Sequence, residues 1–186
     1  TLAASFIGVG CGIGVGLLIG WSIRIRRLVE PVLEMIRMTP PLALLPFFLM
    51  WFGRGVITEI LITMFYGFLF LAINTVEAIR NVPPIYLQAS QTLGATRGQV
   101  YRTVVLPSIV PELTGGIRVA AGLSWALLLG SEYLGAQEGL GRLLLISQVF
   151  FFTGRMIISV ACFAILSFAL NTLIVRMSRG LTQWMP

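Results

Sequence analysis

The side chains in this sequence that could perform chemistry are of unusually few kinds. All thirteen basic residues are arginine, all seven acidic residues are glutamate, and histidine is absent. A Walker phosphate-binding loop needs its lysine, and both a Ser-His-Asp triad and a histidine-ligated metal site need histidine. The sequence therefore predicts a protein that is not an enzyme, with no catalytic residue, no metal site and no bound cofactor of its own.

Three polar residues within long apolar segments are candidates for a different task, the handling of a solute. An ionisable group is costly to bury inside a membrane, so Glu132 is the strongest candidate of the three. Together with Ser131 it could line a translocation pathway or hold its outer gate, or it could instead pair with Arg142 or Arg155. Asn74 could face the same pathway or form a hydrogen bond to a neighbouring helix.

The composition places these residues in a membrane protein. Hydrophobic residues make up 57% of the 186 residues and charged residues only 11%, whereas a soluble domain is about half apolar and about a quarter charged. The mean hydropathy of +0.93 agrees. The net charge of +6 is explained by membrane topology, and nucleic acid is not expected as a partner.

Apolar stretches of suitable length predict an all-α, polytopic transmembrane bundle, with one domain over residues 1–186 and five spans. The first span has glycines at every fourth position, from Gly8 to Gly20, where another helix could approach closely. The pattern of Ile23–Met38 predicts an amphipathic helix at the water boundary. The expected spans are Leu2–Trp21, Leu42–Phe52 (extended backwards through Pro40 and Pro41 as a kinked helix), Val56–Val76, Ile117–Ala136 and Met156–Val175.

The arginines indicate how these spans are oriented. If residues 77–112 are cytoplasmic and the spans alternate outward from them, only Arg54, Arg142 and Arg155 of the thirteen arginines lie outside. This positive-inside bias favours a chain whose C-terminus and 77–112 segment are both cytoplasmic.

Segment 77–112 is the longest hydrophilic stretch, and it contains a spaced motif. It carries Gln88-Ala89-Ser90-Gln91-Thr92-Leu93-Gly94, then nine residues, then Val104-Val105-Leu106-Pro107. This resembles the EAA loop of ABC importer permeases, in which Glu-Ala-Ala, three residues, Gly, nine residues and Ile-x-Leu-Pro follow one another. Gly94 and the Leu106-Pro107 pair match this pattern, whereas Gln88, Ser90 and Val104 replace the Glu, the second Ala and the Ile.

Other segments extend the resemblance over essentially the whole chain. Residues 37–46 are similar to the proline-rich entry to a span in the taurine, alkanesulfonate, nitrate and bicarbonate permeases. The same group is matched by Trp51-Phe52-Gly53, by Gly115-Gly116-Ile117-Arg118, and by Ser131-Glu132 followed by Gly139-Leu140-Gly141. Members usually have a further N-terminal span, which this chain is expected to lack.

The resemblance implies a fold, a set of partners and a function. The fold is that of a type I ABC importer permease in the bacterial plasma (inner) membrane, which forms the translocation pathway and couples it to a separate ATPase. The implied partners are a second permease chain in a homodimer, ATP-binding cassette ATPase subunits that hold ATP and Mg, an extracytoplasmic solute-binding protein and the lipid bilayer. The implied substrate is a small anion such as a sulfonate or taurine. An ion-coupled secondary transporter and a non-transporting membrane scaffold subunit are the alternatives.

Segment 77–112 would then be the cytoplasmic coupling loop, for which an ordinary interfacial loop is the alternative. A short helix with small side chains can fit a cleft on the ATPase, while Ile85, Leu87 and Leu93 are expected to anchor its other side. Arg97 and Arg102 could pair with acidic groups of the partner. The predicted coupling residues are Gln88, Ala89, Ser90, Thr92, Gly94, Ala95, Arg97, Leu106 and Pro107.

Overall fold

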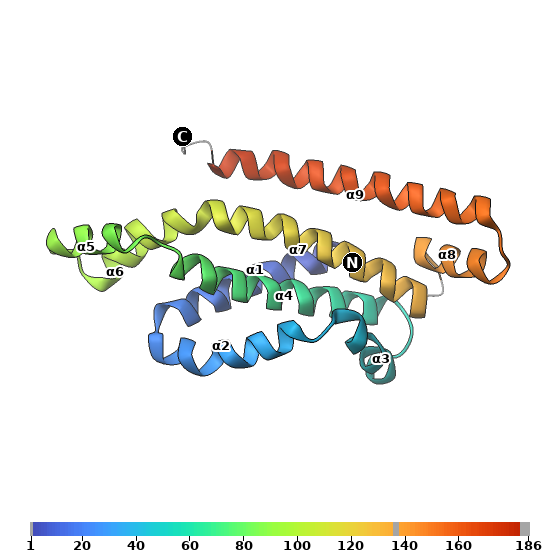
Figure 1. Ribbon diagram of the computed structural model, residues 1–186, viewed down its shortest axis with the longest axis horizontal. Helices are drawn as coiled ribbons and strands as arrows, with labels where there is room; N and C mark the ends of the chain where they lie inside the picture. The colour runs from blue at the N-terminus through green and yellow to red at the C-terminus, as the bar shows by residue number, and fades with distance from the viewer. Residues whose placement is uncertain (1, 136–137, 183–186) are drawn as a thin grey trace.

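The computed structural model describes residues 2–135 and 138–182, and the side chains of residues 6–135 and 138–176. Ala136, the last residue of one predicted span, and the C-terminal residues 183–186 lie outside this part. Long helices lie side by side along one axis, with the short helices α5 and α6 at one end and α8 at the other (Figure 1). The elements are α1 (Leu2–Trp21), α2 (Ile23–Met38), α3 (Pro41–Phe52), α4 (Val56–Arg80), α5 (Pro84–Thr92), α6 (Arg97–Val100), the π-helical turn η1 (Tyr101–Val105), α7 (Leu106–Gly135), α8 (Leu140–Val149) and α9 (Thr153–Thr182).

Helix α1 lies directly against α4 through the predicted stripe of glycines. A Cβ atom on Gly12 would overlap the carbonyl oxygen of Phe68, and one on Gly16 would lie only 2.6 Å from Cβ of Thr75. Glycine is therefore required for this close approach. Because the residue numbers rise together along the two helices, α1 and α4 run parallel.

A bend of 90° separates α2 from α3, so the predicted kinked helix is in fact two helices. Thr39 and Pro40, which lie between them, are extended, with ψ angles of 122° and 127°. A residue that precedes a proline is disfavoured in the helical conformation, and here two prolines follow one another. Helix α2 therefore ends at Met38, and α3 begins at Pro41.

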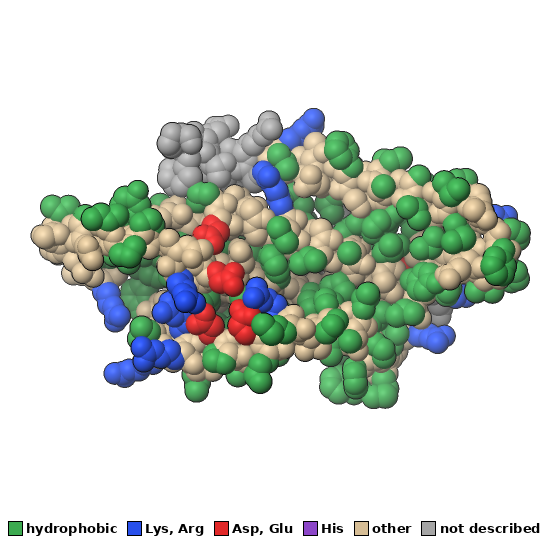
Figure 2. All heavy atoms as spheres, viewed as in Figure 1, with side chains coloured by type: hydrophobic (Ala, Val, Ile, Leu, Met, Phe, Trp, Pro, Cys, Tyr) green, Lys and Arg blue, Asp and Glu red, His purple; other side chains and the backbone are tan. Residues whose placement is uncertain are grey.

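Ion pairs hold α2 beside the last turns of α4. The guanidinium of Arg37 lies 3.6 Å from the carboxylate of Glu77, and that of Arg80 lies 3.9 Å from the carboxylate of Glu30. Basic and acidic side chains gather on this face of the molecule (Figure 2). The apolar side chains of α2 remain exposed, with Leu28 at 77%. The predicted amphipathic pattern is present, and its charged face contacts α4.

The helical stretch that contains α7 begins earlier than the sequence predicts. Residues from Arg97 to Gly135 form one continuous stretch, which includes the wide turn η1. In this turn the N–H of Leu106 donates to the carbonyl of Tyr101, five residues back. Because Pro107 has no N–H to donate, the wider turn lets the chain pass the proline without ending the helix.

Three stretches of the described chain are long and apolar enough to cross a membrane, namely α4, Arg97–Gly135 and the first 24 residues of α9. The pair α2 and α3 makes a fourth if it is counted as one broken span, and the apolar part of α1 that is fully described, Phe6–Trp21, is shorter. Helix α9 lies along one side of the bundle (Figure 1) and stays largely exposed, with Phe168 at 73%. Such an apolar surface suits lipid or another membrane chain.

Candidate functional site

The predicted coupling loop contains one short helix, α5, whose two ends are fixed by the sequence. Pro84 is its first residue, a position that tolerates the missing N–H of proline. At the other end Gly94 has a φ of +79°. Its N–H donates to the carbonyl of Gln91 at 2.9 Å, and the N–H of Ala95 donates to that of Ser90 at 3.1 Å. These bonds form a Schellman motif, in which glycine adopts the left-handed conformation without strain.

The remaining coupling residues lead from α5 into the long helix. The side-chain oxygen of Gln99 accepts hydrogen bonds from the N–H and the hydroxyl of Thr96, at 2.8 Å and 2.9 Å, which fixes the start of α6. Leu106 and Pro107 are the first two residues of α7. The Leu-Pro pair of the motif therefore lies inside the continuous helical stretch Arg97–Gly135, where η1 passes into α7.

A hydrophobic cluster fastens this segment to the long helices. Leu87 of α5 contacts the cluster, whose buried members are Ala78, Val82, Val105 and Ile109. The Tyr101 hydroxyl donates to the carbonyl of Leu17 in α1 at 2.8 Å, and the side-chain amide of Asn81 donates to the Glu112 carboxylate in α7 at 2.9 Å. Through these contacts α5 and its flanks are attached to α1, α4 and α7 together.

The other face of α5 is exposed and partly apolar. Ile85 and Leu93 expose 63% and 88% of their surface, and Gln88 and Ala89 are exposed beside them. The prediction that Ile85 and Leu93 anchor the segment is therefore wrong, and of the three predicted anchors Leu87 alone has this role. An apolar residue in a sequence does not reveal whether it serves the core of its own chain or the surface of a partner.

The hydroxyl groups among the predicted coupling residues are already engaged within α5. Ser90 donates to the carbonyl of Leu87 at 2.8 Å, and Thr92 donates to that of Gln88 at 2.6 Å. Hydroxyls bonded back to their own helix add little to polar recognition of a partner. The exposed face of α5 therefore offers mainly apolar and small side chains.

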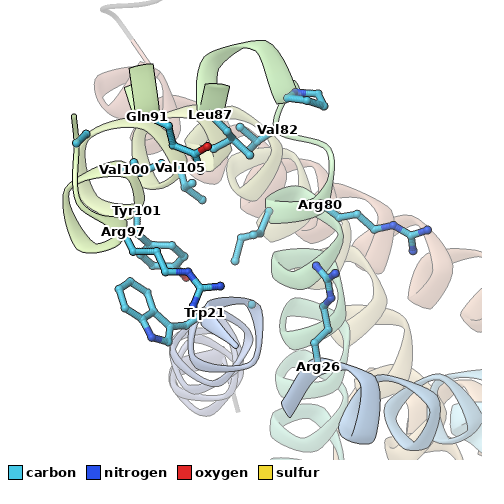
Figure 3. A pocket seen from close by; sticks show the side chains of 14 residues that line it. Trp21, Arg26, Arg80, Val82, Leu87, Gln91, Arg97, Val100, Tyr101 and Val105 are labelled. Carbon is cyan, nitrogen blue, oxygen red and sulfur yellow. The ribbon is translucent and has the colours of Figure 1, made fainter. Parts of the chain in front are cut away.

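The two arginines that were predicted to meet acidic groups of a partner differ in their surroundings. Arg102 is exposed. Arg97, also exposed, extends across a cavity toward the end of α1, where Trp21 lies (Figure 3). Its side chain is therefore directed toward the helices of its own chain.

The three predicted pathway residues do not form one site. Asn74 of α4 lies against Gly116 of α7, where any side chain would overlap its Oδ1 atom, and this buried oxygen accepts no hydrogen bond from the described residues. Ser131 is 15 residues further along α7, or about 22 Å. It is buried, and its hydroxyl donates to the carbonyl of Leu128 at 2.9 Å.

Glu132 caps the N-terminus of α8. Its Oε2 atom accepts a hydrogen bond from the N–H of Gly141 at 2.9 Å. A Cβ atom on Gly139, which precedes α8 with a φ of +115°, would lie 2.6 Å from the same oxygen. A carboxylate at this place satisfies a free N–H and interacts favourably with the helix dipole. The contact joins the two parts of the motif Ser131-Glu132 and Gly139-Leu140-Gly141.

An apolar groove, which the sequence does not predict, lies between α3, α4 and α7. Its volume is about 490 Å³, and its walls are largely apolar, with Leu42, Tyr66, Phe70 and Leu123 among them and Arg37 also lining it. The Arg37 guanidinium is already paired with Glu34 at 2.9 Å and with Glu77 at 3.6 Å. The groove therefore suits a small and largely apolar molecule. The proline-rich motif 37–46 was the available signal, because it supplies Arg37 and Leu42.

Comparison with known proteins decides the family. The sequence model of the family described as binding-protein-dependent transport system inner membrane component matches residues 8–185. The chain belongs to this family. The resemblance to importer permeases predicted from the coupling motif is thereby confirmed, and the chain is a subunit of a membrane transport system.

Curated relatives of this permease include a taurine permease and a putative aliphatic sulfonates permease. It is 34% identical over 183 residues to the taurine transport system permease protein TauC of Escherichia coli (strain K12), which covers 98% of this chain and 66% of TauC. It is 29% identical over 178 residues to the putative aliphatic sulfonates transport permease protein SsuC of Bacillus subtilis (strain 168), covering 96% and 64%. The chain thus spans about two thirds of the length of these relatives.

A solved structure confirms the predicted bundle fold. The permease superimposes on a chain from the structure titled inward facing conformations of the MetNI methionine ABC transporter with a TM-score of 0.72, at 22% sequence identity, covering 97% of this chain and 92% of that one. This similarity is evidence for a shared fold.

Removal of the Glu132 carboxylate tests whether it serves as a cap in this permease. Glu132→Ala is expected to lower the stability of the α7–α8 corner by about 1–2 kcal/mol, which a lower melting temperature in detergent would report. Glu132→Gln should lose less, because its amide oxygen can still accept from Gly141. Glu138→Ala, at an exposed position, is the control. Normal stability of Glu132→Gln combined with abolished uptake would place the carboxylate in the pathway instead.

Proposed function

We propose that this permease is the transmembrane subunit of a bacterial ATP-driven importer, in which α5 docks on a separate ATPase. The observation that carries the proposal is the two-sided character of α5. Its Leu87 side is fastened to the long helices, while Ile85 and Leu93 are exposed at the end of the bundle. Exposed apolar side chains grouped outside the membrane-spanning part favour a partner surface. A movement imposed on α5 would reach α1, α4 and α7 together.

The proposed assembly contains two copies of this permease, two ATPase subunits and an extracytoplasmic solute-binding protein. The exposed apolar faces of α3 and α9 leave room for a second permease chain, and the family description itself refers to a binding protein. ATP and Mg would be held by the ATPase, so the permease performs no chemistry. The positive-inside bias supports a cytoplasmic location for α5 and the C-terminus in the inner membrane.

The proposed substrate is a small anion such as taurine or another sulfonate. The names of the relatives TauC and SsuC support this class. Competition of taurine and of an alkanesulfonate against labelled substrate, with a cationic amine of similar size as the control, tests the class.

Docking on the ATPase is tested with two variants, each of which places one negative charge at a different end of the bundle. Leu93 in the coupling segment and Phe151 between α8 and α9 both expose 88% of their surface. Leu93→Glu is expected to reduce co-purification of the ATPase about tenfold or more, since it places a charge in an apolar contact. Phe151→Glu, at the opposite end, should leave co-purification unchanged.

The opposite results would identify the alternatives. Equal recovery of the ATPase with both variants would remove α5 from the contact. Uptake that continues without the ATPase and follows an ion gradient would indicate a secondary transporter, and absence of both uptake and ATPase binding would indicate a scaffold subunit.

A further inference from the structure

A cavity of about 430 Å³ lies behind α5, at the end of the bundle where α1 and α4 end and α2 begins. Leu87 and Gln91 of α5 form part of its wall, and Trp21 and Tyr101 form another part. None of the roles considered above uses this cavity. It is shown from close by in Figure 3.

The charges that line this cavity are all of one sign. Arg26, Arg80 and Arg97 line it, and no acidic residue of the described part of the chain does. One carboxylate nearby, that of Glu30, lies 3.9 Å from both Arg26 and Arg80 and is shared between them. Among the ion pairs of the described residues, none includes Arg97. The cavity therefore has an excess of positive charge and is complementary to an anion.

The arrangement of the arginines leaves space for an anionic group between two of them. Arg26 extends into the cavity from α2 and Arg97 extends into it from α6, whereas Arg80 points outward (Figure 3). Guanidinium groups bind phosphate through pairs of parallel hydrogen bonds, which makes arginine well suited to recognise it. Two guanidinium groups on different helices can hold one phosphate from two sides.

The aromatic wall favours a position of this cavity at the level of lipid headgroups. The rings of Trp21 and Tyr101 meet edge to face, with centroids 4.7 Å apart. Tryptophan and tyrosine are enriched where the hydrocarbon region meets water, and Trp21 is the last residue of the apolar helix α1. The Tyr101 hydroxyl already donates to the carbonyl of Leu17, so the arginines are the groups available to bind a ligand.

Exposed apolar side chains continue from the cavity along α2. Ile23, Ile25 and Leu28 expose 49%, 48% and 77% of their surface, beside the cavity residue Arg26. An anionic group in the cavity could therefore be joined to apolar chains that follow this helix. A free phosphate ion would use the arginines and leave these side chains without a partner.

We propose that the cavity binds the headgroup of an anionic phospholipid, with its phosphate between Arg26 and Arg97 and its acyl chains along the exposed side chains of α2. Basic pockets between membrane helices are known to take such headgroups. Because α5 contributes to the wall, the bound lipid braces the coupling segment against α1 and α2. The proposal rests on the membrane location of the chain and does not require docking of an ATPase.

The test is native mass spectrometry of the full-length protein in detergent, with phosphatidylglycerol and phosphatidylcholine of identical acyl chains as probes. The wild type is expected to retain phosphatidylglycerol in preference to phosphatidylcholine. The double variant Arg26→Gln/Arg97→Gln should bind phosphatidylglycerol about tenfold more weakly or worse. The matched control is Arg24→Gln/Arg27→Gln, which removes two exposed arginines of the same region that do not line the cavity, and it should bind as the wild type does.

Three outcomes would overturn the proposal. Equal retention of the two lipids by the wild type would remove any headgroup specificity, and equal weakening by the control pair would reduce the effect to overall charge. Full displacement of phosphatidylglycerol by millimolar inorganic phosphate would assign the cavity to a free anion. If the double variant does not elute as a folded protein, the melting temperature of the wild type is measured in the presence of each lipid instead. It should rise with phosphatidylglycerol and not with phosphatidylcholine.

Discussion

Gly94→Ala is expected to reduce ATP-driven uptake by about tenfold while the protein still inserts and folds. Gly94 follows α5 with a φ of +79°, and apart from its chain neighbours no described residue lies within 4 Å of the place where a side chain would begin. The effect is therefore one of backbone conformation, which for a residue other than glycine costs about 1–2 kcal/mol and corresponds to about a tenfold shift of an equilibrium. Uptake into vesicles that contain the complete transporter measures it.

The chain offers a matched control for this substitution four residues away. Gly98 lies in α6, also with open space around it, but without a left-handed φ. Gly98→Ala should therefore leave uptake unchanged, and Gly94→Asn should retain more activity than Gly94→Ala because asparagine adopts the left-handed conformation more readily. If the two alanine variants behaved alike, the Schellman motif would not be what positions α5.

Gly12→Leu is expected to abolish folded protein, which is the largest effect on stability that we predict. A side chain at Gly12 would overlap the backbone of α4 at Phe68, and a backbone carbonyl cannot move aside as a flexible side chain can. Overpacking of a core usually costs about 1–3 kcal/mol, and the cost is highest where the neighbour is rigid. The recovery of monodisperse protein in size-exclusion chromatography measures the result.

Gly14→Leu is the control for this second substitution. It lies on the same helix, two residues away, and no described residue outside its own helix backbone lies within 4 Å of its Cβ position. Its folded yield should therefore remain close to that of the wild type. Equal loss for both variants would show that helix α1 rejects leucine for a reason other than its contact with α4.

Much of the fold could be predicted because membrane helices depend on local composition. The stretches around α4, α7 and α9 are long and apolar, and the four-residue glycine spacing of α1 indicated where another helix could approach. The angle between α2 and α3 could not be predicted in the same way. Two adjacent prolines disfavour a continuous helix, but the 90° bend depends on how α2 and α3 pack against α4 and α7, whose residues are distant in the sequence.

The site was predictable where a local backbone rule decides it, and less so elsewhere. Gly94 was found through its spacing from Leu106-Pro107 in the motif, and its left-handed φ of +79° gives that position a local physical cause. The exposure of Leu93 was missed, because the hydrophobicity of a residue is the same whether it faces its own core or a partner. The Glu132 carboxylate can cap α8 only because Gly141 lies close to α7 in the folded chain. Neither residue type by itself predicts that contact.

The contact between α1 and α4 has a mechanical consequence. Two helices whose backbones touch along a row of glycines have little room to slide or bend independently, because close-packed protein interiors transmit strain. They therefore form a strut that is stiffer than either helix by itself. The hydrogen bond from Tyr101 to Leu17 and the side-chain contacts of Val82 attach the segment around α5 to both members of the strut. In the proposed importer, a movement of α5 would consequently be transmitted to the far end of the bundle with little loss to bending.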